Sequence, residues 1–189
     1  MYRPRSSYFF AAAIYILCAG IAGQSFYTEG AQGVATTIAW CLFVAYAAHL
    51  GFVRPKVTFF DEGITITNPL KEITVGWGEI EDISARYSMY IQVGGEKIYA
   101  WAAQAPGRYH SRTVHATEVR GLQIPDTNSM RAGESPRSHS GVAVALARIR
   151  HDAFAKSETV SATYRSDLNV TGLVILVALF AAAILLTIF

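Results

Sequence analysis

Three long stretches without a single Asp, Glu, Lys or Arg constrain this chain more than any other feature. They cover residues 6–28, 30–53 and 168–189. An α-helix rises about 1.5 Å per residue, so roughly 20 apolar residues cross a hydrocarbon core of about 30 Å. Each stretch is long enough to span a bilayer. The sequence therefore predicts a membrane protein with an N-terminal transmembrane hairpin and one C-terminal transmembrane helix.

The charged residues are concentrated in one block between the second and third stretches. Outside residues 54–167, the only charged side chains are those of Arg3, Arg5 and Glu29. Basic and acidic residues nearly balance within the block, which argues against a nucleic-acid partner. We expect a hairpin over 1–54, a soluble domain over 55–156, and a linker with the last helix over 157–189.

The flanking charges predict an orientation, because cytoplasmic flanks are rich in Lys and Arg. Arg3 and Arg5 precede the first stretch, Arg54 and Lys56 follow the second, and the connection between the two carries only Glu29. We expect a multi-pass plasma-membrane protein whose N-terminus and domain are cytoplasmic and whose C-terminus is outside. The first stretch could instead be a cleaved secretory signal, but we expect an uncleaved helix.

Small residues in the first stretch indicate a helix-packing face. Ala19, Gly20 and Gly23 would allow another backbone to approach closely. The partner is either the second stretch or a helix of another protein, and the sequence leaves both alternatives open.

The charged block alternates apolar and polar residues, as short β-strands do. Strand-like runs surround the Asp61-Glu62-Gly63 and Gly94-Gly95 turns. Glycine pairs supply the positive φ values of a tight hairpin turn. We expect a meander of about six antiparallel strands over residues 57–102.

After these strands, the pattern of the charged block predicts an inserted segment followed by a helix. Residues 105–137 are interrupted by Pro and Gly and are expected to form a surface loop. Residues 138–156 are expected to form a helix with Ser140 as its N-cap. Its predicted core-facing stripe consists of Val142, Leu146, Ile149 and Ala153.

A strand meander followed by one helix is the order of a pleckstrin-homology (PH) domain, and several segments resemble membrane-anchored PH-domain proteins of actinobacteria. These segments are residues 57–64, 73–80, 101–107, 118–122 and 133–138. The resemblance implies an α+β membrane protein with a cytoplasmic PH-like antiparallel β-barrel and a C-terminal capping helix. This resemblance predicts the fold more strongly than the function.

The phosphoinositide site of many PH domains is not expected here, because the first hairpin turn, residues 61–63, is acidic. The best basic cluster is in the inserted segment: Arg108, His110, Arg112, His115 and Arg120. Anionic lipids attract such residues by about 1 kcal/mol per charge near the surface. Arg108, Arg112 and Arg120 are therefore candidate lipid contacts, although a solvated loop is the alternative.

No pattern in the sequence supports an enzyme, a cofactor or a metal site. The histidines are scattered, and Cys18 and Cys41 lie within the apolar stretches, where we expect them to act as small buried hydrophobes. Trp77, Trp101 and Phe154 are expected in the core of the domain.

We therefore expect a non-catalytic membrane-anchored PH-like module that mediates protein–protein assembly at the cytoplasmic face. Its expected partners are membrane lipids and other membrane proteins, with no small-molecule substrate. One alternative is an accessory subunit of a large actinobacterial membrane complex, such as a respiratory cytochrome supercomplex. Another is a module that binds anionic lipids.

Overall fold

The computed structural model describes residues 2–104, 138–157 and 159–189. The chain folds into two compact units. The apolar helical unit comprises residues 5–55, 69–71 and 167–189. The α+β unit comprises the described parts of residues 1–4, 56–68 and 72–166. The segment 105–137, for which the sequence predicts a surface loop, lies outside the described residues.

Three helices of the apolar helical unit are long and apolar enough to cross a membrane, as the sequence predicts. They are α1 (Arg5–Thr28), α2 (Ala31–Ala48) and α4 (Val170–Ile188), and α2 continues into the π-helical turn η1 (His49–Val53). Helices suit a hydrocarbon environment because they satisfy their backbone hydrogen bonds internally.

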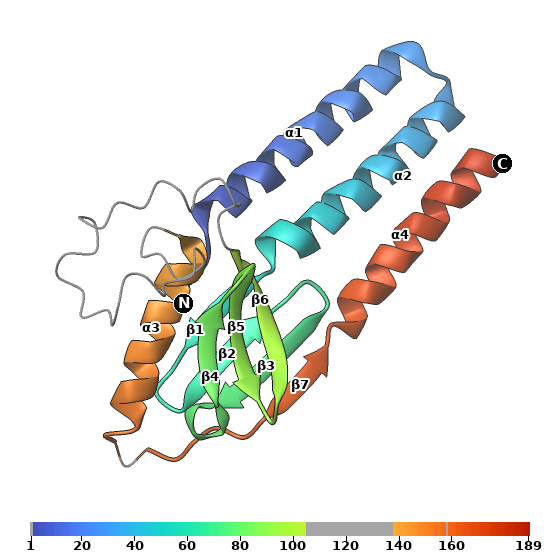
Figure 1. The fold of residues 1–189 in the computed structure, drawn as a ribbon. Helices are drawn as coiled ribbons and strands as arrows, with labels where there is room; N and C mark the ends of the chain where they lie inside the picture. Colours follow the sequence, from blue (N-terminus) through green and yellow to red (C-terminus); the bar gives the residue numbers. More distant parts are fainter. Residues whose placement is uncertain (1, 105–137, 158) are drawn as a thin grey trace, which may run out of the picture. The chain divides into compact units, whose positions relative to one another are not determined.

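Within this unit, α2 packs on both α1 and α4 (Figure 1). The indole of Trp40 donates a hydrogen bond of 3.1 Å to the Thr187 hydroxyl. The Thr36 hydroxyl donates one of 2.8 Å to the Leu186 carbonyl. The rings of Trp40 and Phe180 meet edge to face at 5.9 Å. Such polar and aromatic contacts hold helices together where lipid provides no hydrophobic drive.

The α+β unit contains two antiparallel sheets (Figure 1). One has the order β1-β2-β3-β7 and the other the order β4-β5-β6. The strands of the first are β1 (Lys56–Phe59), β2 (Gly63–Thr67), β3 (Lys71–Gly76) and β7 (Arg165–Leu168). Those of the second are β4 (Asp82–Ala85), β5 (Ser88–Val93) and β6 (Glu96–Gln104).

Six antiparallel strands form in the predicted region, but they are divided between two sheets rather than joined in one meander, and the predicted barrel is not closed. β3 leads through the 3₁₀ turn η2 (Trp77–Glu79) to β4, and the two strands do not pair. Instead, β7 pairs with the free edge of β3, which β4 would have to occupy for the barrel to close. This seventh strand forms within the segment that the sequence predicts to be a linker. Its four residues are all exposed, so no alternation of apolar side chains reveals it.

The core of the α+β unit lies between the two sheets. Its largest fully buried side chains are Trp77, Ile64, Ile66, Met89, Ile91, Val57 and Val75. The Trp77 indole donates a hydrogen bond of 3.0 Å to the Phe60 carbonyl, which satisfies both groups. Phe154 packs against this core, as predicted. The prediction for Trp101 is wrong, because Ala100 and Ala102 point inward on β6 and leave Trp101 51% exposed.

Helix α3 (His139–Phe154) covers the core, which confirms the predicted capping helix. Its N-cap is Ser138 rather than Ser140: the Ser138 hydroxyl accepts a hydrogen bond of 2.8 Å from the Gly141 N–H. Ser140 is fully buried and pairs with the Ser138 hydroxyl at 3.2 Å. The cap therefore begins the helix two residues earlier than expected.

The predicted core-facing stripe of α3 is wrong. The side chains that join the core are those of Ala143, Val144 and Ala147. Val142, Leu146, Ile149 and Ala153 are exposed instead. The large side chains of the sheets already fill the core, so the helix can approach only with its small residues.

The first residues of the chain pair with β1. The Tyr2 N–H donates to the Val57 carbonyl at 2.6 Å, and the Val57 N–H donates to the Tyr2 carbonyl at 2.9 Å. The Tyr2 side chain packs against the core, and this burial raises its pKa to about 12. Tyr2 thus satisfies part of the edge of the first sheet.

We predict that Trp77→Phe destabilises the α+β unit much more than Trp101→Phe. The first substitution removes the donor to Phe60 and leaves a void in the core, at a cost of about 2–4 kcal/mol. The second changes an exposed side chain and should cost less than about 0.5 kcal/mol. Thermal unfolding of the full chain in mild detergent measures both, and equal shifts in Tm would contradict this core.

Candidate interaction surface

The exposed face of α3 is the most distinctive surface of the α+β unit. Val142, Leu146 and Ile149, here called the α3 outer stripe, lie on one side of the helix, opposite the residues that join the core. Ile149 is 64% exposed. An aliphatic row on a helix is a typical surface for a protein partner, because its burial removes apolar area from water.

The helix that carries this stripe is held in place by polar contacts as well as by the core. The Arg148 guanidinium donates two hydrogen bonds to the Ile83 carbonyl, from Nε at 3.0 Å and from Nη2 at 2.7 Å. This bond joins the middle of α3 to β4. The Ser138 cap fixes the first turn. The stripe is thus presented on a fixed element, which lowers the ordering cost of binding.

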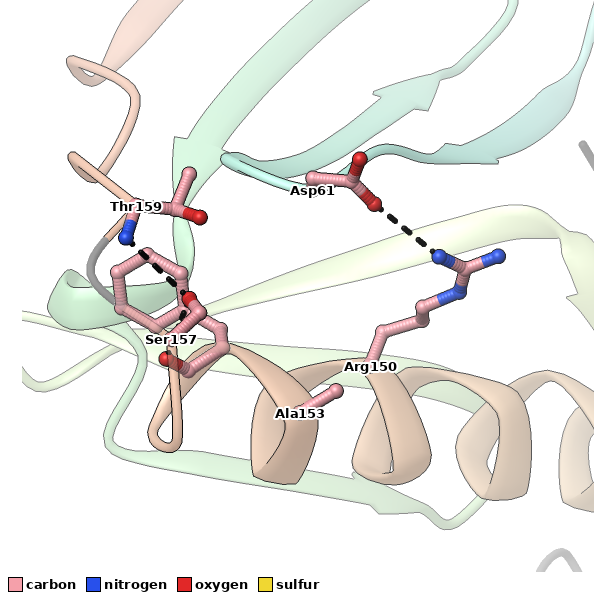
Figure 2. A pocket seen from close by; sticks show the side chains of 6 residues that line it. Asp61, Arg150, Ala153, Ser157 and Thr159 are labelled. Atoms are coloured by element: carbon pink, nitrogen blue, oxygen red, sulfur yellow. Dashed lines mark hydrogen bonds and ion pairs between the residues drawn. The ribbon is translucent and has the colours of Figure 1, made fainter.

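A pocket of about 160 Å³ lies at the C-terminal end of α3 (Figure 2). It is lined by Asp61, Arg150, Ala153, Phe154, Ser157 and Thr159. Figure 2 shows Asp61 and Arg150 facing each other, with 3.2 Å between a carboxylate oxygen and Nη1. The Ser157 hydroxyl accepts a hydrogen bond of 3.3 Å from the Thr159 N–H.

This pocket offers little for catalysis. Its one carboxylate, that of Asp61, is paired with Arg150, and the Ser157 hydroxyl donates its hydrogen bond to the Phe154 carbonyl rather than to a base. The nearby His151 ring meets the edge of buried Trp77, with centroids 6.2 Å apart. Within the described parts of the chain, no three His, Cys, Asp or Glu side chains come together as metal ligands would.

The candidate lipid contacts Arg108, Arg112 and Arg120 lie outside the described residues. Their role therefore stays a prediction.

The small residues of α1 lie on its exposed side. Ala19, Gly20 and Gly23 are exposed, and a Cβ atom added at either glycine would meet no atom within 4 Å. The buried side of α1 carries Ala11 and Ser25 instead. The three small residues thus do not supply the contact with α2. Packing against a helix of another protein stays a prediction.

Sequence reasoning missed the exposed position of the α3 outer stripe. The spacing of the α3 outer stripe correctly predicts one face of a helix, but that face is exposed and does not join the core. The small residues on the opposite face of α3 were the only signal in the sequence for the side that packs on the core.

Comparisons with known proteins add no further constraint. No family model, no curated protein and no solved structure matches this chain. The resemblance to PH-domain proteins therefore stays a prediction, and a functional proposal has to rest on the surfaces described above.

We predict that Arg148→Ala destabilises the α+β unit and that Arg150→Ala does not. The first change removes two charge-assisted bonds to the Ile83 carbonyl, worth about 1.5–2 kcal/mol. The second removes an ion pair whose side chains are 54% and 84% exposed, so solvent screening leaves less than about 0.5 kcal/mol. Thermal unfolding in mild detergent compares them, and a larger loss for Arg150→Ala would refute this assignment.

Proposed function

We propose that the chain is a non-catalytic, membrane-anchored module that mediates protein–protein assembly at the cytoplasmic face of the plasma membrane. The observation that carries this proposal is the α3 outer stripe, a row of large aliphatic side chains on a fixed helix outside the apolar helices. Full burial of a Val, Leu or Ile side chain contributes about 1.5–3 kcal/mol. Ile149 is 64% exposed, Leu146 41% and Val142 37%, so a partner that covers the stripe would gain part of this free energy at each residue and most of it at Ile149.

The cytoplasmic placement rests on charge and on the start of the chain. Arg3 and Arg5 precede α1, and Arg54 and Lys56 follow α2. Tyr2, just before α1, pairs with β1, just after α2 and η1. Two membrane crossings, by α1 and by α2 with η1, would return the chain to the side of the membrane from which it starts, which agrees with that pairing. Together with the positive-inside rule, this supports an N-terminus and a domain on the cytoplasmic side.

A PH-like architecture for the α+β unit is part of the proposal. Two antiparallel sheets that enclose a core, followed by one C-terminal helix packed on that core, support it. The open arrangement of the sheets and the extra strand β7 are departures from the expected barrel. Because this fold serves many roles, the assembly function rests on the α3 outer stripe and not on the architecture.

The exposed small-residue face of α1 favours a second candidate function. Ala19, Gly20 and Gly23 leave room for another helix backbone to pack closely within the membrane. That feature suits an accessory subunit of a large membrane complex, for which a respiratory cytochrome supercomplex is one example. The third alternative, binding of anionic lipids through Arg108, Arg112 and Arg120, rests on sequence alone.

We predict that Ile149→Glu abolishes the association of the chain with its protein partner. The substitution places a charge at the most exposed residue of the α3 outer stripe without touching the core. Ala155→Glu is the matched control, since it adds the same charge at an exposed position next to α3 but off the stripe. The measurement is affinity purification of the tagged full chain from its native membrane in mild detergent, followed by quantitative mass spectrometry.

The expected result is a stoichiometric partner that is retained by the wild-type chain and by Ala155→Glu but lost with Ile149→Glu. If the wild-type chain is recovered as a lone monomer, assembly is not its function. If both variants keep the partner, the stripe is not the contact. A partner lost instead with Gly20→Leu favours the accessory-subunit candidate, because that change fills the small-residue face of α1.

A further inference from the structure

The outer face of β6 carries two exposed aromatic rings. Alternate residues of the strand, from Ile98 to Ala102, join the core or pack against it. Lys97, Tyr99 and Trp101, here called the β6 outer row, point to the other side. Tyr99 is 47% exposed and Trp101 is 51% exposed. The ring of Tyr90 on β5 supports the row, since its centroid lies 5.6 Å from that of Tyr99 and 4.9 Å from the Lys97 ammonium.

The side chain of Asn68 fixes where this row lies in the α+β unit. Its amide nitrogen donates a hydrogen bond of 2.9 Å to the Tyr99 carbonyl, and its amide oxygen accepts one of 2.9 Å from the Trp101 N–H. Asn68 directly follows Thr67, and Thr67 pairs with Lys56, the first residue of β1. The β6 outer row therefore lies beside the end of the first sheet at which β1 begins.

Short connections to the candidate membrane spans bring that end of the sheet close to the membrane surface. Lys56 lies three residues after Val53, where the second span ends. A chain extends by at most about 3.6 Å per residue, so Lys56 lies within about 11 Å of the end of that span. Asn169 directly precedes the third span, and its N–H donates to the carbonyl of Leu70, two residues after Asn68.

The side chains of the β6 outer row have the chemistry of a membrane interface. Trp and Tyr rings are enriched at the level of the lipid headgroups, because each has an apolar body and one polar group that stays hydrated. A Lys side chain can lay its apolar stem along the same surface and keep its ammonium in water. The α3 outer stripe is purely aliphatic, so the two exposed surfaces differ in the partner that they suit.

We propose that the β6 outer row inserts the rings of Tyr99 and Trp101 into the headgroup region of the membrane. The partner is the lipid interface itself, and no anionic lipid is required, because the rings provide the contact. This attachment adds to the two chain connections and restricts rotation of the α+β unit about them. The inference does not depend on the assembly function proposed above, because it concerns a different surface and a different partner.

Tryptophan fluorescence of the full chain in phosphatidylcholine liposomes tests the proposal. Trp40 and Trp77 are common to the wild-type chain and to Trp101→Phe, so the difference between the two proteins reports the emission of Trp101. Lipid that is brominated near the headgroup end of its acyl chains quenches an indole on contact, whereas acrylamide quenches it from water. We expect brominated lipid to remove most of the Trp101 emission and acrylamide on both sides of the bilayer to remove little of it.

The double variant Trp101→Phe/Val160→Trp is the matched control. Val160 is 83% exposed, and the nearby Ala162 N–H donates to the Glu62 carbonyl, beside the opposite end of β2 from Thr67. The two ends of β2 are about 13 Å apart. We expect acrylamide to quench the indole introduced at position 160 and brominated lipid to leave it unchanged.

Three results would overturn the proposal. Brominated lipid could leave the emission of Trp101 unchanged, or it could quench the indole at position 160 equally. Protection of Trp101 from acrylamide without quenching by lipid would assign the row to a contact with protein instead. Far-UV circular dichroism of all three proteins in the same liposomes checks that they keep one fold.

Discussion

The close contact between small residues of α3 and the core of two open sheets is the interaction on which the α+β unit depends. The sheets do not close into a barrel, because β7 occupies the edge of β3 that closure would require. Their shared core therefore needs a cover. Ala143, Val144 and Ala147 provide it, and Arg148 holds the helix to β4 through the Ile83 carbonyl.

This packing explains why the helix has two apolar sides. Its inward side is limited to small residues, since Trp77, Met89 and the aliphatic residues of the strands fill the space between the sheets. Its larger residues are left on the outside, as the α3 outer stripe. Leu146 and Ile149 continue this exposed aliphatic row on the side away from the core. The surplus of apolar surface is the physical basis of the proposed assembly function.

Much of the fold could be predicted from the sequence, because it follows from periodicity and length. The apolar stretches gave three helices, the alternation gave the strands, and a four-three spacing gave α3. The errors arose where partners far apart in the sequence decide the outcome. The orientation of α3 depends on how full the core is, and the edge of β3 is taken by a strand of wholly exposed residues.

The candidate sites were less predictable than the fold. Helix rotation decides that Ala19, Gly20 and Gly23 face away from α2. This outcome cannot be read from residue types, because a different rotation of α1 would turn the same residues towards α2. Trp101 shows the same limit on a strand, where its neighbours Ala100 and Ala102 take the inward positions.

The orientation of α3 is the central claim, and thiol labelling tests it most directly. In a full chain with Cys18 and Cys41 replaced by alanine, a single cysteine is placed at Ile149 or at Val144, which is 2% exposed. The account predicts that a polar maleimide labels Ile149→Cys rapidly in the native protein. Val144→Cys should react only after denaturation. Protection at position 149 together with rapid labelling at position 144 would contradict the account.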